Sequence, residues 1–132
     1  MTLKEYFELK GGLCILSSSG REGKVTTAVY SAPRVMEDGS VAFIMRERLT
    51  YQNVQENPHA ACMFVEHGAG YQGIRLFLTM LREDNDPALI ERMTRRHLTP
   101  EEDRQKGPKH LIVFRVDKVL PLIGTTDPGI EK

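Results

Sequence analysis

The sequence contains no tryptophan, only two cysteines and no excess of either charge. Its 18 basic residues balance 18 acidic residues, whereas a protein that binds nucleic acid or an anionic membrane surface usually carries a basic excess. No apolar run reaches the roughly 20 residues that a membrane-spanning helix needs, and the N-terminal residues lack the apolar stretch of a signal peptide. We therefore expect neither a nucleic-acid partner nor a membrane partner.

The two cysteines, Cys14 and Cys62, both lie inside apolar runs. No Cys-x-x-Cys pair occurs and no histidine stands at helical spacing from either cysteine, which argues against a metal site. We expect two buried free thiols in strands of a reduced, cytoplasmic protein, without a disulfide. A chain of 132 residues is long enough for one domain with its own core, spanning residues 1–132.

The most informative stretch of the sequence begins at Val41. Val41–Met45 is an unbroken apolar run of strand length, which predicts a strand buried on both faces. A charged corner at 46–48 follows, and then a predicted helix of about two turns over Thr50–Asn57. Thr50 is a residue type that caps a helix N-terminus, and Pro58 ends the helix because proline restricts the residue before it.

This stretch has the chemistry of an anion site. A helix N-terminus offers free N–H groups and the positive end of the helix dipole, and here Arg46, Arg48 and the Thr50 hydroxyl lie next to it in the sequence. The planar guanidinium group of arginine matches a phosphate well. The alternative is a solvated turn in which Glu47 pairs with one of the two arginines.

The remaining pattern predicts a mostly antiparallel sheet with short helices. One helix is expected over 2–10 with Thr2 as its cap, and another begins at Asp86-Pro87 and ends at Arg95-Arg96. Tight polar turns between successive apolar segments favour antiparallel pairing in a small barrel. The predicted strands cover 13–17, 24–31, 41–45, 59–66, 74–81 and 111–119, with a charged loop over 98–108.

The candidate general acids and bases form no recognisable catalytic set. Neither a Ser/His/Asp order nor a pair of carboxylates stands out, so we assign no catalytic residue. His67, in the glycine-rich loop 67–73, is the histidine best placed for proton transfer. His59, His97 and His110 are interpreted as surface residues. The loop glycines do not form a dinucleotide-binding motif, because no Gly-x-Gly-x-x-Gly follows a strand and opens a helix.

Taken in order, these segments resemble the pyridoxamine 5′-phosphate oxidase-like split-barrel flavoproteins, a group that binds FMN. The hairpin from Leu13–Leu16 to Val25–Tyr30, the strand over 39–45 and the helix that ends in Asn57-Pro58 carry the resemblance, which covers roughly residues 2–119. It implies a mostly β (α+β) fold, a six-stranded antiparallel split β-barrel with short flanking helices.

The resemblance also implies a homodimer with one FMN at each of two clefts between the subunits. Many relatives carry a lysine where this chain has Thr50, which leaves Arg46 and Arg48 as the cations at the phosphate. The implied FMN contacts are Thr27, Ala28, Val29, Tyr30 and Ser31 along the ring, Ile44, Met45 and Arg46 beside the ribityl chain, Arg48, Leu49 and Thr50 at the phosphate, and Gln72 and Arg75 from the other protomer.

Three functions remain open at this point. The first is an FMN-dependent oxidoreductase that acts on a small-molecule substrate or electron donor, with the chemistry supplied by the flavin. The second is a non-enzymatic protein of the same fold that carries electrons or binds a flavin or haem, for which His59 or His67 would be the axial ligand. Some split barrels use a deazaflavin in place of FMN. The third is an interaction domain that binds no cofactor.

Overall fold

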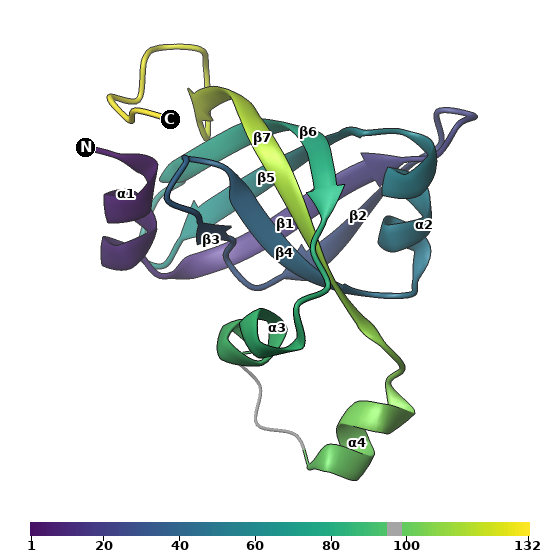
Figure 1. Ribbon diagram of the computed structural model, residues 1–132. Coiled ribbons are helices and arrows are strands. Elements are labelled where there is room, and N and C mark those ends of the chain that lie inside the picture. The colour runs from purple at the N-terminus through teal and green to yellow at the C-terminus, as the bar shows by residue number, and fades with distance from the viewer. Residues whose placement is uncertain (95–98) are drawn as a thin grey trace.

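The computed structural model describes residues 1–94 and 99–132, and its centre is one strongly curled antiparallel sheet (Figure 1). The strand order in the sheet is β2-β1-β5-β6-β7-β4-β3. The helices are α1 (Leu3–Leu9), α2 (Leu49–Glu56), α3 (Pro87–Met93) and α4 (Pro100–Gln105). The strands are β1 (Gly12–Ser19), β2 (Val25–Tyr30), β3 (Arg34–Val35), β4 (Val41–Arg46), β5 (His59–Glu66), β6 (Gly73–Glu83) and β7 (Lys109–Pro121).

The expected mostly β architecture is confirmed, and the strand count is corrected from six to seven. The additional strand is the two-residue β3, which pairs with the start of β4. Two residues give no periodicity that a sequence pattern can detect. The long strands β6 and β7 pair along most of their length, with register shifts between Phe77 and Leu78 and between Met80 and Arg82. Such bulges bend strands and so support the curl of the sheet.

Strand β4 is buried on both faces, as the apolar run predicted. Val41, Phe43 and Met45 point into the main core inside the curled sheet, together with Phe64 and Phe114. The alternate residue Ala42 belongs to a smaller cluster with Leu111, Val113 and Ile90 of α3. Helix α3 therefore covers the outer face of β4 and β7, and the partly buried Ile44 lies against it.

The predicted first helix and its cap are confirmed. Thr2 accepts a hydrogen bond from the Glu5 backbone N–H, and the Glu5 carboxylate accepts one from the Thr2 backbone N–H, which is a capping box. The helix expected from Asp86 is found as α3, with the Asp86 side chain capping it. The predicted end of that helix, Arg95 and Arg96, lies outside the described residues.

The segment expected as a charged loop over 98–108 contains helix α4. Thr99 caps it by accepting a hydrogen bond from the Glu102 backbone N–H, and Pro100 occupies the first helical position. Three acidic residues fill the first turn, where they face the positive end of the helix dipole. The start signals were therefore present in the sequence, but α4 has no buried residue and so shows no apolar periodicity.

Cys14 and Cys62 are buried in β1 and β5, as expected, and both are free thiols. Their sulfur atoms lie 3.1 Å apart. The hydrogen bond with Cys14 and the burial of the Cys62 side chain raise the pKa of the Cys62 thiol. In the described part of the chain no helix is long and apolar enough to cross a membrane.

Gly70, in the loop between β5 and β6, and Gly73, the first residue of β6, both have positive φ but lie in different surroundings. A Cβ at Gly73 would overlap the carbonyl oxygen of Phe64, whereas a Cβ at Gly70 would meet nothing within 4 Å. We expect Gly70→Ala to lower the free energy of unfolding by about 1–2 kcal/mol, the cost of a left-handed alanine. Gly73→Ala should cost clearly more, because the Phe64 backbone must also move.

Denaturant unfolding of the two variants measures this difference directly. Equal losses of stability in Gly70→Ala and Gly73→Ala would show that β5 and β6 do not approach as closely at Gly73 as described.

Candidate cofactor site

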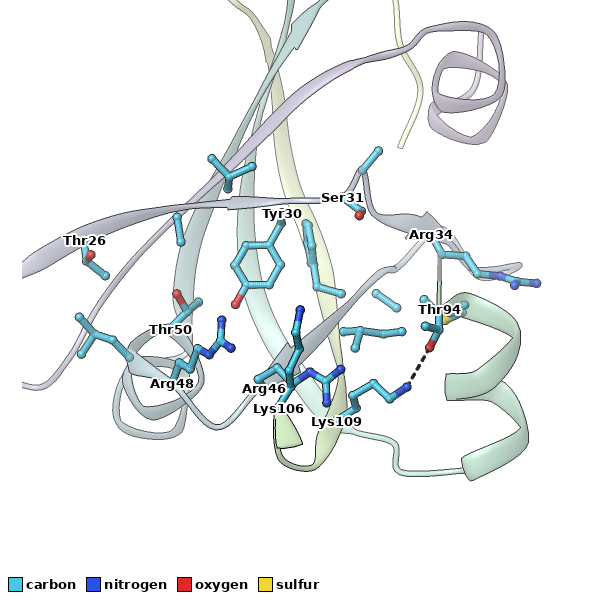
Figure 2. A pocket seen from close by; sticks show the side chains of 18 of the residues that line it. Thr26, Tyr30, Ser31, Arg34, Arg46, Arg48, Thr50, Thr94, Lys106 and Lys109 are labelled. Carbon is cyan, nitrogen blue, oxygen red and sulfur yellow. Dashed lines mark hydrogen bonds between the residues drawn. The ribbon is translucent and has the colours of Figure 1, made fainter. Parts of the chain in front are cut away.

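A cavity lies where the curled sheet fails to close. Strand β2 pairs only with β1 among the described strands, and β4 pairs with β7 and β3. The β2 edge therefore faces β4 without backbone pairing, and Tyr30 of β2 packs edge-on against Phe43 of β4, with ring centroids 6.0 Å apart. A cavity of about 480 Å³ opens beside this contact (Figure 2), a volume typical of cofactor sites.

The cavity has apolar strand walls and a cationic rim. Ala28 and Val29 of β2 and Ala42, Phe43 and Ile44 of β4 contribute apolar surface. Among the described lining residues there is no aspartate, glutamate, cysteine or histidine, whereas several cations are present. These cations are Arg34, Arg46, Arg48, Arg92, Lys106 and Lys109. Since the whole chain has no net charge, the cavity concentrates positive charge that is balanced elsewhere.

One end of the cavity is formed by the start of α2. The helix begins at Leu49, and Arg48 occupies the N-cap position with extended backbone and no capping hydrogen bond from its side chain. Thr50 is therefore not the N-cap, which corrects the sequence-based prediction. It lies inside the first turn and is 5% exposed, and its side chain faces the cavity next to Tyr30 (Figure 2).

The Tyr30 hydroxyl points toward Thr50 and Arg48 (Figure 2). Burial of the ring raises the pKa of Tyr30, and the neighbouring Thr50 hydroxyl and Arg48 guanidinium oppose this shift only in part. The phenol therefore keeps its proton at neutral pH and can donate a hydrogen bond. Arg48, Thr50, Tyr30 and the first N–H groups of α2 together offer several donors to one anion.

Arg46 lines the cavity, but its guanidinium group is already engaged. It donates to the Asp103 carboxylate at 2.7 Å and to the backbone carbonyls of Asp103 and Gly107. Lys109 lies 3.1 Å from the same Asp103 carboxylate. The hydrogen bonds from Arg46 and Lys109 hold the pKa of Asp103 below its usual range. Arg46 therefore anchors α4 to the end of β4, and Arg48 is the cation left at the start of α2.

Glu47 does not neutralise its neighbouring arginines. Its carboxylate lies 3.0 Å from Nε2 of His110, and the other ring nitrogen of His110 lies 2.7 Å from Glu83. Tyr51 stacks on the His110 ring, with centroids 4.3 Å apart, and donates to Glu83 at 2.8 Å. The structure thus pairs Glu47 with His110 and not with an arginine. His110, which we predicted to be a surface residue, is held between Glu47, Glu83 and the Tyr51 ring.

Most of the predicted cofactor contacts line this cavity, and a few lie elsewhere. Met45 is fully buried in the main core, and Thr27 and Gln72 are exposed and do not line the cavity. Arg75 donates to the carbonyls of Pro121 and Gly124 and lies opposite Met63 on the outer face of the sheet. The predicted residues that line the cavity are Ala28, Val29, Tyr30, Ser31, Ile44, Arg46, Arg48, Leu49 and Thr50.

The sequence analysis missed the residues that α3, α4 and the start of β7 contribute. Arg92, Met93, Thr94, Lys106 and Lys109 line the cavity, and no local motif marked them, because they reach it through tertiary folding. Ala42 could have been found from the alternation along β4, since it shares a face with Ile44 and Arg46. His67 is exposed and does not line the cavity.

The two carboxylates at His110 predict a pH-dependent stability. Burial lowers the pKa of His110, but the hydrogen bonds to Glu47 and Glu83 outweigh burial and raise it. A raised folded-state pKa stabilises the fold below the unfolded value of about 6.5, and this contribution is lost as the pH rises through the folded value. We expect the wild type to exceed a His110→Gln variant in free energy of unfolding at low pH. This difference should fall by on the order of 1 kcal/mol as the pH rises from about 6.5 through the folded-state pKa of His110.

Urea unfolding at several pH values tests this, with His67→Gln as the control because His67 is exposed. If the stability difference between wild type and His110→Gln is the same at every pH, His110 is not held as an imidazolium by Glu47 and Glu83.

Comparison with known proteins supports the fold. No protein-family model and no curated protein sequence matches this chain. Among solved structures, an FMN-binding protein from Syntrophomonas wolfei is 21% identical with a TM-score of 0.71, and the match covers 91% of this chain and 83% of that protein. An F420 reductase is 17% identical with a TM-score of 0.71, covering 90% of this chain and 97% of the reductase.

General stress protein 26 from Bacillus anthracis also matches, with 16% identity, a TM-score of 0.64 and coverage of 92% of this chain and 94% of that protein. Identities this low are informative about the fold, and the seven-stranded curled sheet agrees with it. The resemblance predicted from the sequence is therefore confirmed as a structural one: this chain has the split-barrel fold of the pyridoxamine 5′-phosphate oxidase-like FMN-binding proteins.

Proposed function

We propose that this protein binds FMN at the opening between β2 and β4 and acts as an FMN-dependent oxidoreductase on a small molecule. The observation that carries the proposal is the combination of a donor-rich end at Arg48, Thr50 and the start of α2 with apolar walls on β2 and β4 in the same cavity. FMN has the matching chemistry, a phosphate joined through a ribityl chain to a flat ring. An FMN-binding protein and a reductase share the fold.

The residues present fit the cofactor. The phosphate would accept hydrogen bonds from Arg48, Thr50 and the first amides of α2, and the neutral Tyr30 phenol is a further donor. The ring would lie along β2, whose edge offers backbone N–H and C=O groups unpaired by another described strand. When bound, FMN supplies the electron transfer, and the protein supplies binding, orientation and the electrostatic setting of the ring.

The lining residues also favour a second candidate function, a flavoprotein that carries electrons without a catalytic residue of its own. No carboxylate, thiol or imidazole lines the described cavity, so the protein itself offers few groups for proton transfer there. Oxidation of reduced nicotinamide by the FMN-loaded protein, measured at 340 nm, distinguishes the two functions: turnover supports the oxidoreductase, and bound flavin without turnover supports the carrier.

Since neither His59 nor His67 lines the cavity, the haem alternative receives no support.

We further propose that the protein is a homodimer formed through the outer face of the sheet. Ile15 lies opposite Met63, and Ala61 lies opposite Phe77, and directly paired residues share one face of a sheet. Leu13, Met63 and Phe77 are 45%, 36% and 45% exposed. A contiguous apolar face of this kind marks an interaction surface. Arg75, on the same face, could then reach the cofactor of the other subunit, as could Gln72.

The free thiols of Cys14 and Cys62 fit a reduced, cytoplasmic protein, which is the location we propose.

A Phe77→Glu variant should be mainly monomeric, because a carboxylate placed in an apolar interface loses its hydration without gaining a partner. Sedimentation velocity measures the change. Leu9→Glu, on the exposed face of α1 where Leu9 is 68% exposed, is the control that should leave the dimer intact. A wild-type protein that sediments as a monomer would contradict the proposed dimer.

The phosphate contact predicts a difference between FMN and riboflavin, which lacks the phosphate. We expect Arg48→Met to weaken FMN binding by about tenfold to a hundredfold, because a charge-assisted hydrogen bond contributes about 1.5–3 kcal/mol. Riboflavin affinity should change little. Titration by flavin fluorescence measures both, and Arg21→Met, an exposed arginine in the turn after β1, is the control.

If wild-type protein takes up no FMN at all, the proposed cofactor is wrong, and an interaction domain that binds no cofactor becomes the best-supported function. Uptake of a deazaflavin instead of FMN would keep the oxidoreductase class and replace the cofactor.

A further inference from the structure

The cavity carries more positive charge than one phosphate requires. The cations at the α2 end are Arg48 and the helix start, but Arg92, Lys106 and Lys109 line the opposite side, where α3 and α4 approach β7. Figure 2 shows Lys109 beside Thr94 on this side, and the Lys106 side chain extending from the end of α4 into the cavity. Clustered cations at a concave surface attract anions more strongly than isolated ones.

These cations are only partly neutralised. Arg46 and Lys109 share the single carboxylate of Asp103, at 2.7 Å and 3.1 Å, so one positive charge remains after the three groups are summed. Arg92 and Lys106 have no ion pair or side-chain hydrogen bond within residues 1–94 and 99–132. No acidic residue among those described lines the cavity.

Within this group of cations, contacts hold Lys109 in place, whereas Arg92 and Lys106 are positioned by the backbone of α3 and α4. Thr94 donates its hydroxyl hydrogen bond to the Ile90 carbonyl at 2.8 Å and accepts one from Lys109 at 3.3 Å. The Arg46–Asp103 ion pair anchors α4 to β4, and Lys106 follows at the C-cap of α4. A side chain fixed in this way, as that of Lys109 is, loses less entropy when it binds a ligand.

We propose that the α3–α4 side of the cavity is a second anion site, formed by Arg92, Lys106 and Lys109, which binds the carboxylate or phosphate group of an anionic substrate. This rests on the proposed function, in which FMN uses its one phosphate at Arg48 and Thr50 and leaves the second group of cations for another ligand. The substrate class of the flavoprotein is therefore an organic anion. A neutral substrate would leave these cations without a counter-charge.

Inorganic pyrophosphate is the probe for this site. FMN-loaded wild type should bind one pyrophosphate per chain at constant ionic strength, measured by calorimetry, and should keep its flavin, measured by absorbance. Lys106→Met and Arg92→Met should each weaken pyrophosphate binding by about tenfold, since each removes a charge-assisted contact. Lys24→Met is the matched control, because Lys24 is exposed in the hairpin and pairs only with Glu22 at 3.6 Å among described residues.

The same titration on flavin-free Arg48→Met protein separates this proposal from the proposed function. Pyrophosphate binding should persist there, even if FMN binds to no form of the protein. The second site is overturned if wild type binds no pyrophosphate, if Lys106→Met and Arg92→Met bind it as Lys24→Met does, or if Arg48→Met alone abolishes binding. Release of flavin by pyrophosphate would also overturn it, because the two anions would then share one site.

Discussion

The edge of β2 that faces β4 without a paired strand is the constraint on which the site depends. Closing the sheet there would satisfy the backbone groups of β2, but the Tyr30–Phe43 contact spans the opening instead. This arrangement keeps an apolar cavity beside a strand whose backbone groups are still available for hydrogen bonds. A flat ligand with a polar edge can use both features, which is why we propose a flavin rather than a flexible chain for this cavity.

The second organising feature is how the chain distributes its charge. The whole sequence is neutral, yet the residues that line the cavity include cations and no described acid. Asp103 is used to fix Arg46 and Lys109, and Glu47 and Glu83 are held by His110. Both arrangements keep carboxylates away from Arg48. The proposed anion binding at the start of α2 thus depends on partners that lie far from it in the sequence.

Sequence patterns predicted the regular parts of this fold and the residues at one end of its cavity. The apolar run at Val41–Met45, the Thr2 cap and the helix start at Asp86-Pro87 report local physics, so they were readable without the structure. The start of α2 was placed correctly to within two residues, but its cap was wrong: Thr50 has a side chain suited to capping, and the backbone instead turns at Arg48. Caps depend on where the chain enters the helix as well as on residue type.

The other side of the cavity could not be predicted in the same way. Lys106 belongs to a segment that looks like solvated charged surface, and the contact of Arg46 with Asp103 of α4 brings it to the cavity. Arg92 reaches the cavity because α3 packs against β4 and β7. The pairing of Arg46 with Asp103 joins residues 57 positions apart, and His110 meets Glu47 across 63 positions. No spacing rule connects such residues, so their roles emerge from the fold.

A crystal structure of the protein grown with FMN is the measurement that tests the central claim most directly. The account predicts electron density for a flavin in the opening between β2 and β4, with its phosphate against Arg48, Thr50 and the first amides of α2. Density for the phosphate at any other surface, or a flavin bound away from β2 and β4, would contradict it.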